Sequence, residues 1–156
     1  MIKIAYPPFD FKLRKEEGTQ VIFDELRKVW LKLTPEEWVR QNFVQYLRSR
    51  NYPAALIAIE KRIMVGEMVK RFDLLVFDKA HQPFMMIECK AATIALTPDV
   101  LNQVLRYNIS MPCKYLVITN GSHVMAFAKH GMQLEELEDF PEWSDDERRE
   151  TSGDLE

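Results

Sequence analysis

Two apolar strands with charged residues near one end dominate the middle of this 156-residue chain. The first spans about residues 69–78 and contains Asp73, and the second spans about residues 83–90 and contains Glu88 and Lys90. A short polar segment between them predicts a turn. Successive side chains of a strand point to opposite faces, so Glu88 and Lys90 lie on the same side. Charged side chains are seldom buried without partners, so two of them on one face of an apolar strand require an explanation.

Two other segments carry signals for helix starts. Thr34-Pro35-Glu36-Glu37 combines a capping threonine, a proline for the first helical position and a glutamate three residues after the cap. Thr97-Pro98 opens a second helix, which we expect to run to about Ser110, whereas the first ends near Pro53. Further strands are predicted at residues 20–24, 55–63, 115–119 and 123–129.

These elements divide the chain into three parts. Residues 34–134 form a core of the α/β class in the order α-β-β-β-α-β-β. Residues 1–33 predict an extended arm and a hairpin, in which residues 27–33 either continue the hairpin or form a short helix. Residues 135–156 hold eleven acids against two arginines, a composition that predicts a disordered tail. Alternatively, this tail screens a basic face or docks another subunit.

Charge and cysteine content narrow the class of protein. The net charge of −3 conceals a balance of +6 over residues 1–134, which suits a polyanionic partner. Only two cysteines occur, Cys89 and Cys113, so no disulfide framework is expected. The N-terminus has no signal-peptide pattern and no stretch reaches membrane-span length, so we expect a cytoplasmic protein.

The charged residues of the two central strands suit a metal site. Mg²⁺ prefers a few carboxylate oxygens together with water and phosphate oxygens, and Asp73 and Glu88 can supply the carboxylates. A bound metal activates water and neutralises charge on a phosphate, while Lys90 can orient the water or stabilise the transition state. The alternative is a cross-strand ion pair at a sheet edge, which contributes little to stability.

The second helix presents Gln103 and Tyr107 on one face, four residues apart. An amide and a phenol beside a metal site can bind phosphate or hold the charged residues in place, and Arg106 on a neighbouring face can reach a phosphate. Spacing alone favours the simpler interpretation of an amphipathic helix whose tyrosine packs on the sheet.

Taken together, these residues resemble the PD-(D/E)XK nuclease superfamily, and more closely the N-terminal nuclease domain of type I restriction enzyme R subunits. Phe72 stands where the motif has its nominal proline. The resembling segments are Glu36 to Gln41, Arg71-Phe72-Asp73, Ile87 to Ala91, Gln103 to Asn108 and Tyr115 to Gly121. Five segments in order, over roughly residues 34–130, make the resemblance fairly specific.

The resemblance implies a restriction-endonuclease-like core, with a mixed central sheet flanked by helices and an Mg²⁺ site that Mn²⁺ can also fill. The implied metal ligands are Asp73, Glu88 and the backbone carbonyl of Cys89. Lys90 is the implied catalytic lysine, and Gln103 and Tyr107 support the site.

The first helix supplies further candidates. The superfamily often adds a glutamate from this helix as a metal ligand, and Glu37 is the better candidate here, although it also serves as the capping-box partner. Glu36 is the weaker one. Arg40 can contact the phosphate backbone or brace the acids, and Arg71 and Arg106 are further candidates for nucleic-acid contact.

The leading hypothesis is therefore a metal-dependent endonuclease that hydrolyses DNA. The chain shows no P-loop pattern, so we expect a stand-alone domain without a helicase motor. One alternative is a catalytically silent module of the same fold that binds nucleic acid or a partner protein. Another is a homo-oligomer or a subunit that cleaves only within a restriction or defence complex.

Overall fold

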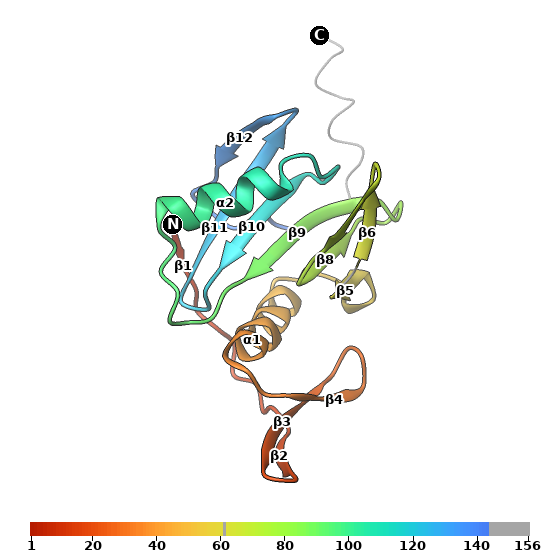
Figure 1. The fold of residues 1–156 in the computed structure, drawn as a ribbon, viewed down its shortest axis with the longest axis vertical. Helices are drawn as coiled ribbons and strands as arrows, with labels where there is room; N and C mark the ends of the chain where they lie inside the picture. The colour runs from red at the N-terminus through yellow and green to blue at the C-terminus, as the bar shows by residue number, and fades with distance from the viewer. Residues whose placement is uncertain (61, 144–156) are drawn as a thin grey trace.

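The computed structural model describes residues 1–60 and 62–143 of the chain. Its centre is a seven-stranded mixed sheet with a helix against each face, which confirms the α/β class. The strands of this sheet are β1 (Ile2–Lys3), β5 (Ile57–Ile59), β8 (Leu74–Phe77), β9 (Pro83–Cys89), β10 (Tyr115–Thr119), β11 (His123–His130) and β12 (Gln133–Glu136). The helices are α1 (Pro35–Ser49) and α2 (Pro98–Asn108) (Figure 1).

The main sheet has the order β1-β11-β10-β9-β8-β5, and β12 pairs with the later part of β11. Its neighbouring strands are antiparallel except β9 and β10. This parallel pair follows from the chain order, because α2 lies between the two strands and carries the chain back across the sheet. The strands at the centre of the sheet are those predicted from residues 69–90 and 115–129.

Both helices begin where the sequence predicts. The Thr34 hydroxyl oxygen accepts a hydrogen bond from the Glu37 N–H at 3.0 Å, and Pro35 occupies the first helical position. The Thr97 hydroxyl oxygen accepts from the Val100 N–H at 3.3 Å in the same way. Capped starts of this kind are defined locally, which is why they are predictable from a few residues.

Each helix covers its own hydrophobic cluster. Val39, Phe43 and Leu47 of α1 pack with Leu74 and Ile87 on one face of the sheet. On the other face, α2 packs through Val104 onto a cluster that includes Leu75, Met86 and Phe72. Met86 lies in the cluster under α2, whereas Ile87 and Cys89 lie in the cluster under α1, so the side chains of β9 alternate between the two faces.

The predicted boundaries of the two strands before β9 are wrong. The segment expected to form one strand at 69–78 is divided into β7 (Met68–Arg71) and β8, and β7 pairs with β6 (Arg62–Val65) as a separate two-stranded sheet. A strand is interrupted here because Asp73 bonds through its side chain to the Cys89 N–H. The expected strand at 55–63 is likewise shortened to β5, which follows a 3₁₀ turn at Ala54–Leu56.

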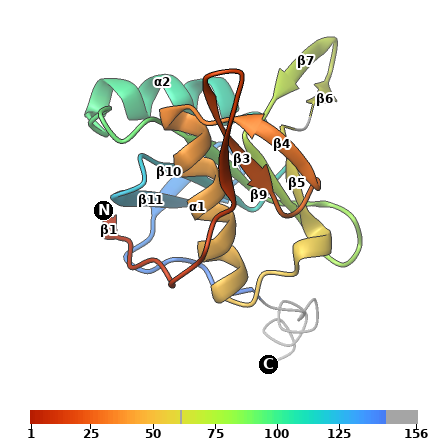
Figure 2. The ribbon, with the colours of Figure 1, turned by 90° about the horizontal axis from the view of Figure 1, so that it is seen from below.

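The N-terminal region forms more structure than an arm and a hairpin. β2 (Leu13–Glu16), β3 (Thr19–Asp24) and β4 (Val29–Lys32) make a three-stranded antiparallel sheet, which resolves residues 27–33 as a strand. α1 lies between this N-terminal sheet and the main sheet (Figure 2). β1 joins the edge of the main sheet beside β11.

The acidic segment expected as a tail from residue 135 is ordered in its described part. β12 extends to Glu136, and Phe140 is buried against Phe43 and Tyr46 of α1. The packing of Phe140 orders this segment despite its acidic composition. Residues 144–156 lie outside the described residues. Among the helices described, none is long and apolar enough to cross a membrane.

Candidate functional site

Asp73 and Glu88 face one another across neighbouring strands. The β8–β9 ladder pairs Leu74 with Ile87, so the next positions in this antiparallel register place Asp73 opposite Glu88. The Cys89 N–H donates to Asp73 Oδ2 at 2.8 Å, which fixes that carboxylate against β9. Lys90 Nζ lies 3.7 Å from Glu88 Oε1. The structure therefore brings together the three residues that the strand pattern singled out.

The two carboxylates open into a cavity of about 490 Å³. Its wall is formed by the end of β4, the first part of α1, Glu60 after β5, residues 71–73 before β8, and the end of β9. The charged residues lining it are Lys32, Glu36, Glu37, Arg40, Glu60, Arg71, Asp73 and Glu88. Arginines pair with Glu37 and Glu60, whereas Asp73 and Glu88 lie side by side on neighbouring strands.

Burial and the charges of neighbouring carboxylates raise the pKa values of both acids. Burial, followed by the charge of Asp73, raises the pKa of Glu88 from 4.5 to about 7, although Lys90 opposes the shift. Burial also raises the pKa of Asp73, against the hydrogen bond from Cys89 and the charge of Arg40. Glu36 raises the pKa of both acids further. The nearby bases therefore leave part of the negative charge uncompensated.

These shifts predict that the metal-free protein loses stability as the pH rises from 5 to 8. The folded state holds the Glu88 proton up to about pH 7, whereas the unfolded chain releases it near 4.5, so this contribution is complete below 4.5 and lost by about 7. The pKa of Asp73 moves in the same direction. The expected loss is on the order of 1–2 kcal/mol, since Glu88 is partly solvated. Urea unfolding in EDTA at the two pH values measures it.

Glu88→Gln is the matched control, because it keeps the shape and removes the titration. This variant should lose most of the pH dependence, and Mg²⁺ should restore stability to the wild type at pH 8, since a ligand that binds only the folded state stabilises it. The lowered pKa values of Asp24 and Glu60 act below about pH 4.5 and do not offset the effect. Equal stability of the wild type at both pH values would contradict the assignment.

The donor set fits a magnesium ion. Magnesium binds proteins through one or two carboxylates and keeps several waters, so the opposed oxygens of Asp73 and Glu88 suffice. A cation there relieves the repulsion that raises both pKa values. Within residues 1–60 and 62–143 there is no group of three or more histidine, cysteine or acidic side chains already arranged around a metal position. The Cys89 main chain, predicted to supply a carbonyl ligand, lies beside Asp73.

The structure places the two glutamates of the first helix differently from the prediction. Glu37 is buried, with its carboxylate paired to Arg40 and accepting from Gln41 Nε2 at 2.7 Å. Glu36 is exposed, lines the cavity and acts electrostatically on Asp73 and Glu88. Both glutamates line the cavity, but the Glu37 carboxylate is committed to Arg40 and Gln41, so the acid that α1 offers to the site is Glu36.

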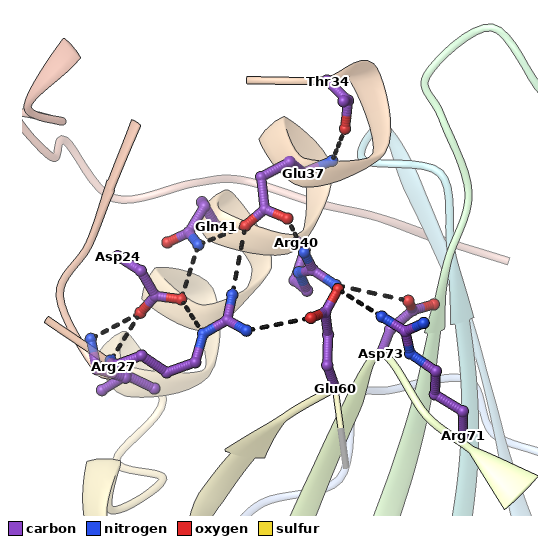
Figure 3. Close-up of polar contacts among 10 residues, drawn as sticks. Asp24, Arg27, Thr34, Glu37, Arg40, Gln41, Glu60, Arg71 and Asp73 are labelled. Carbon is purple, nitrogen blue, oxygen red and sulfur yellow. Dashed lines mark hydrogen bonds and ion pairs between the residues drawn. The ribbon is translucent and has the colours of Figure 1, made fainter. Parts of the chain in front are cut away.

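A network of ion pairs links the N-terminal sheet to the site (Figure 3). Glu60 lies at its centre, with Oε1 2.8 Å from Arg40 Nη1 and 3.1 Å from Arg71 Nη2, and Oε2 3.2 Å from Arg27 Nη1. Arg40 also lies 3.9 Å from Asp73 Oδ1. Arg40 thus braces the acids, whereas Arg71 is more than half exposed at the cavity wall. Glu60 is not among the residues that the sequence pattern singles out, although an acid directly after a strand is a signal that could have found it.

Gln103 and Tyr107 do not line this cavity. Both are exposed and border a separate pocket on α2 together with Asp99, Asn102 and Arg106. The two residues share one face of α2, as predicted, but that face does not border the cavity that contains Asp73 and Glu88. Cys89 is buried, and burial raises the pKa of its thiol well above the ordinary value, so it is no nucleophile.

The comparison with known families agrees with this geometry. Residues 35–141 match the family described as type I restriction enzyme R protein N terminus (HSDR_N). The chain belongs to this family. Its members carry a PD-(D/E)XK-type nuclease domain, and the match includes α1, Asp73, Glu88, Lys90 and α2. No curated protein matches the chain.

The limits of the HSDR_N match are informative. It begins at the first residue of α1 and ends just after Phe140, whose ring packs on that helix. The acidic segment is therefore included in the family region up to Pro141. The N-terminal sheet precedes the matched residues in the chain. It nevertheless contributes to the site, because Arg27 pairs with Glu60 and Lys32 lines the cavity.

Proposed function

We propose that this protein is a metal-dependent nuclease with a restriction-endonuclease-like core, which hydrolyses phosphodiester bonds of DNA. The observation that carries the proposal is the pair of opposed carboxylates, Asp73 and Glu88, in one cavity with Lys90 beside Glu88. Burial and neighbouring carboxylates raise the pKa values of both acids. Membership of the HSDR_N family, a restriction-enzyme family, supports both the reaction class and DNA as the substrate.

Asp73 and Glu88 would hold Mg²⁺ or Mn²⁺, with the Cys89 carbonyl as a third oxygen donor. The ion would supply an activated water and charge neutralisation at the phosphate. The Cys89 N–H keeps Asp73 oriented before any ion binds, so the site is partly preorganised. Glu36 is the exposed acid of α1 in the cavity lining, and we assign it the outer position beside the two ligands.

Lys90 would act on the reacting water or the phosphate. Its ammonium group has three donors and no acceptor, so it cannot ligate a metal but can donate to an oxygen. It lies on the same face as Glu88 and is held by the main-chain bond from its own N–H to the Thr119 carbonyl at 2.8 Å. A fixed main chain limits the positions that the long side chain can reach.

Of the two arginines that line the cavity, Arg71 would receive a phosphate. Arg71 is exposed at the cavity wall, and a guanidinium group can bind a phosphate through two parallel hydrogen bonds. Arg40 is buried and committed to Glu37 and Glu60, so it supports the site from behind. Gln103, Tyr107 and Arg106 lie on α2 outside the cavity, where they can contact substrate only beyond the scissile bond.

Asp73→Asn tests the proposed site directly. We expect supercoiled plasmid and labelled oligonucleotides to be cleaved by the wild type with Mg²⁺ or Mn²⁺, and the variant to lose about 100-fold or more in rate. Metal affinity measured by calorimetry should fall by more than about tenfold, since a ligand oxygen is lost.

Asp10→Asn is the matched control, because Asp10 is an exposed aspartate outside the cavity lining. It should bind metal and cleave like the wild type. A wild type that neither binds metal nor cleaves any of these substrates would overturn the proposal, and so would an Asp73→Asn variant that retains both activities.

A further inference from the structure

We propose that the outer face of the N-terminal sheet binds the sugar-phosphate backbone of a nucleic acid strand and directs it toward the acidic cavity. The outer face is defined as the side of β2, β3 and β4 that carries Lys12, Arg14, Phe23, Trp30 and Lys32. This inference rests on the proposed function for the destination of the strand, but its test measures binding by itself.

Strand register sets the composition of this face. Arg14 and Lys32 both lie opposite Val21, and Trp30 lies opposite Phe23, so these residues share one side of the sheet. Lys12 reaches the same side, since its carbonyl accepts from the Phe23 N–H and its ammonium lies over that ring.

The opposite side of the sheet is already occupied. Ile22 is fully buried, and the buried Asp24 accepts a hydrogen bond from Gln41 Nε2 of α1 at 3.1 Å. Asp24 also accepts from Arg27 Nε at 2.7 Å. This inner side is therefore fastened to α1, which leaves the outer face directed to solvent, with the Arg14 side chain 50% exposed.

Aromatic rings hold the cations of the outer face in place. The Arg14 guanidinium lies 3.9 Å from the Trp30 ring centre, and Lys12 Nζ lies 5.1 Å from that of Phe23. Lys28, from the β3–β4 turn, is 6.0 Å from the same Phe23 ring. Contacts of this kind fix long side chains without neutralising them. The result is a row of positioned cations, which suits a repeating anion.

The ion pairs on this face are replaceable. Arg14 pairs with Glu16 through Nε at 2.8 Å, and Lys28 pairs with Glu25 at 3.4 Å. Exposed pairs contribute about 0–1 kcal/mol, so a phosphate can displace either carboxylate at small cost. Releasing counterions from a nucleic acid then favours binding.

Lys32 connects the row of cations to the candidate site. It belongs to the outer face by register and also lines the cavity that contains Asp73 and Glu88. A strand whose phosphates follow the row from Arg14 to Lys32 therefore arrives at the two acids. This continuity favours nucleic acid over an acidic protein segment as the occupant.

Charge reversal on the two sides of one strand tests the proposal. Arg14→Glu changes the outer face, and Lys15→Glu makes a similar change one residue later, where the side chain is also exposed but points to the other side. Both are made in a Lys90→Ala background so that the nucleic acid stays intact. Affinity for a labelled 30-nucleotide strand and for the matching duplex is measured against salt concentration.

We expect Arg14→Glu to weaken binding by about tenfold or more, and to reduce the slope of log affinity against log salt by about one. Lys15→Glu should weaken it by less than about threefold. Trp30→Leu removes the ring beneath Arg14 but keeps apolar volume, so it should weaken binding by a smaller factor of about two to five. Circular dichroism verifies folding of each variant.

Equal weakening by Arg14→Glu and Lys15→Glu would overturn the proposal, because net charge rather than the outer face would then control binding. Absence of binding in the Lys90→Ala background would also overturn it. The outcome is separable from the proposed function. If Arg14→Glu leaves cleavage unchanged, the nuclease does not use the outer face. If the protein binds nucleic acid through the outer face but does not cleave it, the binding surface is supported and the nuclease activity is not.

Discussion

Lys90→Ala should lower the rate of Mg²⁺-dependent strand cleavage by about 10²–10⁴-fold while leaving metal affinity within about threefold of the wild type. The reason is the division of roles in the site. Asp73 and Glu88 offer oxygens to the metal, whereas the Lys90 ammonium, 3.7 Å from Glu88 Oε1, has only protons to donate. Removing it should therefore affect the reaction and spare binding of the ion.

Single-turnover cleavage and calorimetric titration with Mg²⁺ measure the two effects separately. Lys3→Ala, an exposed lysine of β1, is the control and should change neither. Lys90→Arg should remain far below the wild type, since the broader guanidinium cannot occupy the place of a compact ammonium. Full cleavage by Lys90→Ala would show that the lysine only balances the charge of Glu88.

Arg40→Met should destabilise the fold by about 3–5 kcal/mol. The Arg40 side chain is 10% exposed and the Glu37 side chain 6%, and the two are paired directly. Without the guanidinium, Glu37 keeps the hydrogen bond from Gln41 and a distant Arg27, 3.9 Å away, which leaves a buried charge poorly compensated. Glu60 also loses one of its three arginines.

Urea unfolding measures the loss in free energy. Arg48→Met on the same helix is the matched control, because Arg48 is exposed, and it should change stability by less than about 0.5 kcal/mol. The double variant Glu37→Leu with Arg40→Met should recover most of the loss, since it removes the unpaired charge together with its partner. An Arg40→Met protein with the wild-type urea midpoint would contradict the buried pair.

Local signals predicted much of the fold. The starts of α1 and α2 follow from Thr34-Pro35 and Thr97-Pro98, because a cap involves only three or four adjacent residues. β9, β10 and β11 follow from apolar runs and alternation. The break in the strand at Asp73 was not predictable from local signals, since it depends on a hydrogen bond to Cys89, sixteen residues away.

The site was predictable in part for the same reason. Asp73, Glu88 and Lys90 stand out as charges in apolar strands, and their grouping follows from a hairpin-like register. The sequence did not show which of Glu36 and Glu37 is available to the site. Adjacent helix positions point about 100° apart, and only the packing of α1 against both sheets decides which glutamate is buried and paired with Arg40.

By itself, the sequence determined the α/β class, the family and the strand-borne acids, because these depend on local pattern and on short-range pairing. Tertiary structure alone decided the rest. It gathered Arg27, Arg40 and Arg71 around Glu60, separated Gln103 and Tyr107 from the acids, and set Lys32 at the cavity wall. These contacts join residues distant in the chain, and their energies depend on burial, which no local pattern specifies.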